Sequence, residues 1–219
     1  MSFKKIKEKM VTITDTLTPS SSAINQAIKE IKHYLNVELS VVKESKEGIN
    51  ALKEYAEAET PSLKGAISAL ANKIERIENA REEKVAQLQE KFVNPLNKIV
   101  EEAKILNNEL KEAENAKKAL EKAERKLEKL ESKPIEKLKP GQLDDAKSDV
   151  KSAKANYEKE EAGAKRATET FNKKRLDTIQ LILKDVADIE NKYHEKALKL
   201  MGAVAKKVEK EPPIPSLEE

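Results

Sequence analysis

The residues that could carry chemistry in this sequence are lysines rather than catalytic groups. The chain of 219 residues contains two histidines, His33 and His194, and no cysteine. The absence of cysteine excludes a thiolate metal site and a cysteine nucleophile, and no cluster of further ligands accompanies either histidine. Carboxylates are plentiful, but paired acid and base catalysis needs a cleft that separates their environments. We therefore predict no catalytic residue, no metal site and no cofactor.

Basic residues gather in one stretch near the middle of the chain. Lys133, Lys137 and Lys139 stand among two prolines and a glycine, which predicts a loop that leaves their side chains free. The sequence leading into this loop adds Lys117, Lys118, Arg125, Lys126 and Lys129. Such cations can bind lipid phosphates. The alternative is a solvated charged face, which the residues alone favour because glutamates are interleaved throughout.

The first seventeen residues form a second candidate for membrane contact. Apolar side chains share one stripe of a predicted helix, at Phe3, Ile6, Met10 and Ile13. Lysines lie mostly on the other side, at Lys4, Lys5, Lys7 and Lys9. This pattern is typical of a helix that inserts into the headgroup layer. The same spacing describes a seam that packs on a helical bundle, and the two interpretations are equally supported.

Composition and periodicity predict long helices that position these groups. Charged residues make up 38% of the chain and aromatic residues 3%, so the core must be thin. Apolar residues recur at steps of three and four in three stretches, residues 24–56, 63–130 and 143–204. Thr60 and Pro61 separate the first two stretches, and we expect the Thr60 side chain to cap the second helix. The predicted fold class is all-α, an elongated antiparallel three-helix coiled coil.

Two further features define the expected architecture. Pro95 falls inside the second periodic stretch and predicts a kinked helix. The first helix is shorter than the hairpin of the other two, so it covers only about half of that hairpin. The covered half is bulkier, and a leftover apolar face there is expected to meet a second copy. The residues that we assign to this core and dimer region are Phe92, Leu96, Phe171 and Tyr193.

The chain divides into three parts on these patterns. Residues 1–19 form the amphipathic segment, which a Thr-Pro-Ser-Ser-Ser break ends, residues 20–210 the helical domain, and residues 211–219 a tail rich in proline and glutamate. No apolar run approaches the roughly 20 residues of a membrane span, so membrane contact must be peripheral. Nucleic acid is not an expected partner, because the net charge is only +3 and no basic stripe is free of glutamate.

Three motifs resemble one family of helical proteins. They are Tyr-Ala-Glu-Ala-Glu-Thr-Pro-Ser-Leu at residues 55–63, Arg-Glu-Glu-Lys-Val at 81–85 and Phe-Val-Asn-Pro-Leu at 92–96. Their order and spacing resemble the BAR superfamily, and within it the Chibby-interacting BAR-domain family. The third helix adds Ile189-Glu190 and a His-Glu-Lys-Ala-Leu run at 194–198. The likeness covers residues 18–210, although residues 111–166 match only in charge and helical period.

The resemblance implies a function that the residues alone do not. It implies a crescent-shaped homodimer that binds anionic, phosphoinositide-rich membrane and senses or induces its curvature, as a cytoplasmic protein peripheral on membranes. It also favours Lys133, Lys137 and Lys139 of the predicted loop, which we name the tip lysines, as lipid contacts. It further implies a Chibby-like protein as a partner. The alternative is a cytosolic structural coiled coil that holds protein partners without binding lipid. Salt-sensitive binding to anionic vesicles separates the two.

Overall fold

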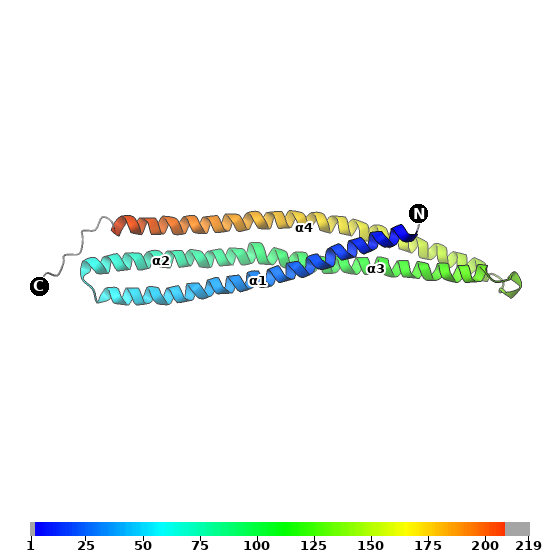
Figure 1. The fold of residues 1–219 in the computed structure, drawn as a ribbon, viewed down its shortest axis with the longest axis horizontal. Coiled ribbons are helices and arrows are strands. Elements are labelled where there is room, and N and C mark those ends of the chain that lie inside the picture. Colours follow the sequence, from blue (N-terminus) through cyan, green and yellow to red (C-terminus); the bar gives the residue numbers. More distant parts are fainter. Residues whose placement is uncertain (1–2, 209–219) are drawn as a thin grey trace. The chain divides into compact units, whose positions relative to one another are not determined.

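The structure is a computed structural model that describes the backbone of residues 3–208 and the side chains of residues 22–205. Within these residues every long element is a helix and there is no strand (Figure 1). The elements are α1 (Phe3–Glu57), α2 (Pro61–Leu88), η1 (Gln89–Val93), α3 (Asn94–Glu131), η2 (Ile135–Lys137) and α4 (Gln142–Val208). The predicted all-α fold is confirmed. The side chains of the predicted amphipathic segment, residues 1–19, lie outside the described residues.

The break between the first two helices falls where the sequence placed it. α1 ends at Glu57 and α2 begins at Pro61, in the first turn, where a missing amide hydrogen leaves no bond unmade. The Thr60 side chain makes no capping hydrogen bond, contrary to our prediction. Instead the Thr60 carbonyl accepts the first helical bond from the amide of Lys64 at 2.8 Å. The proline and this backbone bond are therefore sufficient to start α2.

Pro95 is accommodated by a change of helix type. The five residues of η1 form a π-helical turn, and the amide of Asn94 donates to the carbonyl of Gln89, five residues earlier. Pro95 has no amide hydrogen and its ring crowds the preceding turn. A π turn widens the backbone there and lets helix continue into α3. The sequence located this irregularity but did not specify the π turn.

Pro19, the proline of the Thr-Pro-Ser-Ser-Ser segment, does not end the helix as we predicted. The expected interruption at residues 18–22 is absent, because α1 begins at Phe3 and is helical up to Glu57. A single proline removes one backbone hydrogen bond, and helix can form on both sides of it. The amphipathic residues and the first helix of the domain thus belong to one helical element.

The loop between α3 and α4 reverses the chain, as predicted. Gly141 has a φ of +78°, the left-handed region that favours glycine. The amide of Gln142 donates to the carbonyl of Lys139 at 3.1 Å, which closes the turn before α4. Asp144 and Asp145 lie in the first turn of α4, where the helix dipole stabilises negative charge.

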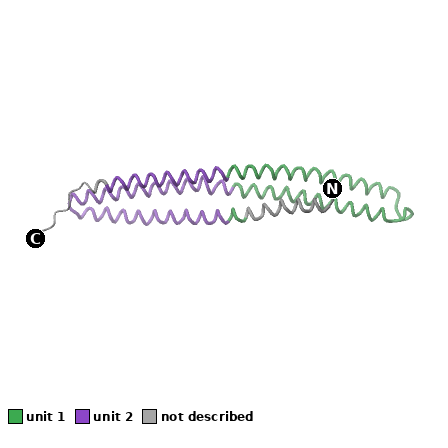
Figure 2. Tube along the Cα trace, turned by 45° about the horizontal axis from the view of Figure 1, so that its top comes forward, with its two compact units in different colours: residues 1–25, 98–178 green, residues 26–97, 179–219 purple. Residues whose placement is uncertain are grey.

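The chain forms two compact units (Figure 2). Unit 1 comprises residues 1–25 and 98–178, and unit 2 comprises residues 26–97 and 179–219. The core of unit 1 contains many small side chains, including Ala103, Ala113, Ala116, Ala146 and Ala164. The core of unit 2 is bulkier, and α1 contributes a buried residue at every seventh position: Ile28, Leu35, Val42, Ile49 and Ala56. A repeat of seven is the spacing of coiled-coil packing.

Candidate functional site

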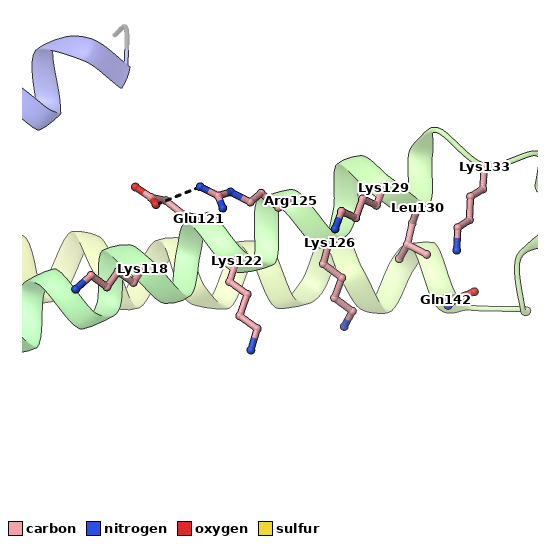
Figure 3. Close-up of a pocket in the computed structure, with 9 residues that line it drawn as sticks. All are labelled: Lys118, Glu121, Lys122, Arg125, Lys126, Lys129, Leu130, Lys133 and Gln142. Carbon is pink, nitrogen blue, oxygen red and sulfur yellow. Dashed lines mark ion pairs between the residues drawn. The ribbon is translucent and has the colours of Figure 1, made fainter.

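A basic groove on α3 of unit 1 is the candidate binding site. Its lining has six cationic side chains and one carboxylate, together with an aliphatic and an amide side chain (Figure 3). The residues are Lys118, Lys122, Arg125, Lys126, Lys129 and Lys133, with Glu121, Leu130 and Gln142. Apart from the adjacent pair Arg125 and Lys126, the cations recur at steps of three and four, which places those on α3 along one side of the helix. We name this set the basic groove.

Three of the six cations are partly neutralised. Arg125 lies 3.9 Å from Glu121, Lys118 lies 2.6 Å from Glu114, and Lys126 lies 2.8 Å from Asp149 on α4. The hydrogen bond to Asp149 raises the pKa of Lys126, so this ammonium stays charged. These pairs are exposed and contribute little to stability.

The other three cations are available to an anion. Within residues 22–205, no ion pair involves Lys122, Lys129 or Lys133. Figure 3 shows Lys122 and Lys126 directed to the same side of α3, while Arg125 reaches toward Glu121. Ammonium groups with no carboxylate partner are the ones that can bind a phosphate without first breaking an ion pair.

The groove contains most, but not all, of the predicted lysines. Lys118, Arg125, Lys126, Lys129 and Lys133 line it. Lys117 is half-buried and lies outside the lining, whereas Lys137 and Lys139 are exposed in the loop beyond α3. The candidates at Lys4, Lys5, Lys7, Lys9, Phe3, Ile6, Met10 and Ile13 lie outside the described side chains.

Sequence reasoning did not include Lys122 and Gln142 among the candidate site residues, although both line the groove. Lys122 stands four residues after Lys118 and four before Lys126, so a helical projection would have placed it on the same side. Gln142 comes from the start of α4 and reaches the groove only because the loop reverses the chain. No local sequence signal identifies such a residue.

Unit 2 contains a second concentration of charge, which is buried. The side chain of Lys84 on α2 is only 3% exposed, and its Nζ lies 3.1 Å from Glu38 of α1 and 3.6 Å from Glu190 of α4. The same Nζ donates to the hydroxyl of Tyr34 at 3.1 Å and lies 4.6 Å from the ring centre of Tyr193. Lys84 therefore connects three helices.

Arg81 completes this buried cluster. Its guanidinium lies 2.7 Å from Glu38 and 3.0 Å from Glu78, and 5.3 Å from the ring centre of Tyr193. Burial alone would raise the pKa of Glu38, but hydrogen bonds from Arg81, Tyr34 and Lys84 lower it to about 2. Burial likewise opposes the charge of Lys84, yet its bonds to Tyr34 and Glu38 raise its pKa.

The cluster stabilises charged forms and does not poise a group for proton transfer. A general acid or base needs a pKa near the working pH. The pKa of Glu38 is lowered and that of Lys84 is raised, so both pKa values move further from neutral pH. His194 is 71% exposed and lies 3.6 Å from Glu190. Among the described residues, no three histidine, aspartate or glutamate side chains form a group that could hold a metal ion.

Two apolar stripes remain exposed on unit 2. On α1, Tyr34, Val41 and Tyr55 are 43%, 41% and 55% exposed and recur at multiples of seven, with Gly48 between them. On α4, the stripe contains Leu183, Leu198 and Met201. Tyr34 and Glu190 both lie within 3.6 Å of the same Lys84 Nζ, so the two helices that carry the stripes approach one another at that level, where α4 presents a carboxylate. We name them together the apolar face.

The four residues assigned to the core and dimer region are mainly internal. Leu96 and Tyr193 of unit 2 are buried, as is Phe171 of unit 1, and Phe92 is half-buried.

In the described part of the chain, no helix is both long enough and apolar enough to span a bilayer.

Solved structures of low sequence identity share the fold. The amphiphysin BAR domain from Drosophila matches with a TM-score of 0.74 at 13% identity, over 93% of each chain. A BAR protein from Galdieria sulphuraria matches with a TM-score of 0.69 at 16% identity, over 93% of this chain and 98% of its own. The N-terminal I-BAR domain of IBARa from D. discoideum matches with a TM-score of 0.54 at 16% identity, over 94% and 93%.

The comparisons with sequences give a family. No curated protein matches the chain. The model of the FAM92 protein family matches residues 21–211, which cover most of both units. The BAR resemblance derived from the motifs is thereby confirmed at the level of the fold. The chain belongs to the FAM92 protein family and has a BAR-type fold.

Proposed function

We propose that this protein is a non-enzymatic membrane scaffold, a homodimer that binds anionic membrane through the basic groove and senses or induces curvature. The observation that carries the proposal is the groove itself, whose lining has six cations and only one carboxylate. It lies on a fold shared with BAR domains. BAR domains as a class act on membranes, and the buried charges of unit 2 offer no catalytic alternative. The protein would be peripheral, held by charge.

The groove matches a lipid surface in both chemistry and strength. Each lysine near an anionic membrane contributes about 1 kcal/mol, so single contacts are weak and several must act together. Lys122, Lys129 and Lys133 carry no competing ion pair among the described residues. Several ammonium groups along one groove also suit a headgroup with more than one phosphate, which is the basis for proposing a phosphoinositide preference.

The apolar face supports the dimer in this proposal. Exposed apolar side chains on neighbouring helices mark a candidate interaction site, and here they come from α1 and α4. Seven-residue spacing at Tyr34, Val41 and Tyr55 is the spacing by which one helix packs on another. A second copy offers the same stripe and buries it symmetrically. Two copies would present two basic grooves and multiply the membrane affinity.

Vesicle co-sedimentation tests the groove. The variant Lys122→Glu/Lys129→Glu/Lys133→Glu reverses the charge of the three groove cations that make no ion pair with other described residues. We expect affinity for vesicles with anionic lipid to fall at least about a hundredfold, because three contacts of about 1 kcal/mol are replaced by repulsion. Binding of the unmodified protein should also weaken as salt is raised.

A matched variant controls for net charge. Lys147→Glu/Lys151→Glu/Lys154→Glu makes the same charge change at exposed positions on α4 of the same unit, outside the groove. We expect it to retain most of the binding. Equal loss in both variants would mean that overall charge, and not the groove, governs binding. Absence of binding by the unmodified protein at low salt would reject the membrane function and favour a coiled coil that holds protein partners.

The dimer is tested separately, with a pair of neighbouring leucines. Leu183 and Leu181 are 65% and 58% exposed and lie on different sides of α4, because two residues turn a helix by about 200°. Leu183→Glu should shift sedimentation toward monomer, whereas Leu181→Glu should leave the dimer intact. A dimer that tolerates Leu183→Glu would exclude the apolar face as its interface.

A further inference from the structure

The loop between α3 and α4, residues 132–141, is named the tip loop here, and it presents one highly exposed aliphatic side chain. Ile135, the first residue of η2, is 87% exposed, the highest value among the large hydrophobic side chains that the structure describes. Single exposed apolar residues are common on protein surfaces and need no special explanation. Ile135 is different because of how its backbone is held and which charges surround it.

The backbone around Ile135 is ordered by short-range bonds. The amide of Lys137 donates to the carbonyl of Pro134 at 2.9 Å, and the amide of Leu138 donates to the carbonyl of Ile135 at 3.0 Å. The amide of Lys139 donates to the side chain of Gln142 at 3.1 Å. Pro134 also restricts the chain just before the turn. The loop thus presents Ile135 in a fixed position, which lowers the entropic cost of using it in binding.

The surroundings of Ile135 are basic. Lys133, Lys137 and Lys139 are all exposed within four residues of it, against the two carboxylates of Glu131 and Glu136. Lys133 also lines the basic groove, so the loop continues the charged site. A cationic rim around an apolar side chain is complementary to a bilayer, where phosphates lie above the acyl chains. The lysines would contact the phosphates, and the isoleucine would reach the acyl chains beneath them.

A folded protein partner is a poorer match for this loop. A specific protein interface buries on the order of 1,000 Å² or more, with a packed apolar centre. Here Leu138, the nearest other aliphatic residue, is half-buried and only Ile135 projects. A bilayer, by contrast, can accept one aliphatic side chain without a matching pocket.

We propose that Ile135 inserts into an anionic bilayer at the boundary between headgroups and acyl chains when the tip lysines dock. The proposal rests on the membrane function proposed above and adds a hydrophobic wedge to it. The wedge makes part of the binding resistant to salt, because burial of apolar surface is not screened as charge contacts are.

The absence of tryptophan from the chain allows a direct test. Ile135→Trp places the only indole at the tip, and vesicles of anionic phospholipid with brominated acyl chains quench an indole that reaches them. Ile105→Trp is the matched control, since Ile105 is 62% exposed on α3 of the same unit but away from the loop. We expect strong quenching for Ile135→Trp and none for Ile105→Trp. Bound but unquenched Ile135→Trp would overturn the insertion.

Affinity gives an independent measurement. Removal of an inserted isoleucine by Ile135→Ser should weaken binding to anionic vesicles about tenfold, and the effect should persist when salt screens the lysines. Ile105→Ser should change nothing. If Ile135→Ser binds as the unmodified protein does, the wedge is rejected while the groove stands. If the unmodified protein does not bind at all, the membrane function itself fails.

Discussion

The buried ammonium of Lys84 makes the sharpest prediction about stability. Lys84→Met keeps most of the aliphatic stem but removes the charge that lies between Glu38 and Glu190. The two carboxylates belong to α1 and α4, so both lose a partner when one residue of α2 is changed. We expect the variant to fold with the same helices and to be less stable.

The size of the loss follows from what each carboxylate retains. Breaking a buried ion pair costs roughly 3–5 kcal/mol when one charge is left without a partner. Glu38 is not left alone, because Arg81 remains 2.7 Å from it, and Glu190 is 29% exposed and reaches water. Loss of the buried cation–π contact with Tyr193 adds up to about 2 kcal/mol. We therefore expect the free energy of unfolding to fall by about 2–3 kcal/mol, no more than the penalty for one isolated buried charge.

Denaturant unfolding followed by helical circular dichroism measures this change. The protomer concentration must be held fixed, because the proposed dimer would contribute to apparent stability. Lys184→Met is the control, since Lys184 is exposed on α4, and it should alter stability by less than about 0.5 kcal/mol. A Lys84→Met variant as stable as the original, or more stable, would refute the reasoning. It would mean that the cost of burying the ammonium exceeds what its contacts return.

Two further predictions concern Glu38 and Gly48. The pKa of Glu38 is lowered from 4.5 to about 2 in the folded chain, so its contribution is present above pH 4.5 and is lost as pH falls toward 2. Glu38→Gln should therefore remove about 3 kcal/mol at most and flatten unfolding free energy against pH in that window; an unchanged slope would contradict this. A Cβ built at Gly48 meets nothing within 4 Å, so Gly48→Ala should stabilise the helix by about 0.5–1 kcal/mol. Sedimentation should nevertheless show that Gly48→Leu weakens the dimer, and an unchanged dimer would place Gly48 outside the interface.

The helical fold was predictable because its signals are local and repeated. The apolar period located the helices, and Pro61, Pro134 and Gly141 located the breaks, since each residue acts through its own backbone geometry. The same local rule led us to predict, wrongly, that the helix would be interrupted at Pro19. A proline weakens helix at one point, but whether the chain stops there depends on the residues on both sides, which a local rule does not weigh.

The candidate sites were less predictable because they depend on contacts between distant residues. Most of the basic groove lies on one helix, and its lysines were foreseen apart from Lys122. Gln142 joins it only through the turn at Gly141. The buried cluster brings Glu38, Lys84 and Glu190 together from three helices, over separations of 46 and 106 positions. In the sequence, each is one charge among many, and nothing marks it as buried.

The buried cluster also bears on the proposed dimer. Lys84 contacts Tyr34, which belongs to the exposed stripe of α1, and Glu190, which lies beside the exposed stripe of α4. One ammonium therefore bridges the two helices that carry the apolar face and helps to fix their lateral spacing. A partner that packs across both stripes requires that spacing, because helix interfaces tolerate little misfit. Lys84→Met should consequently weaken dimerisation although Lys84 itself is buried. Leu181→Glu changes an exposed residue outside the apolar face and should leave dimerisation unchanged.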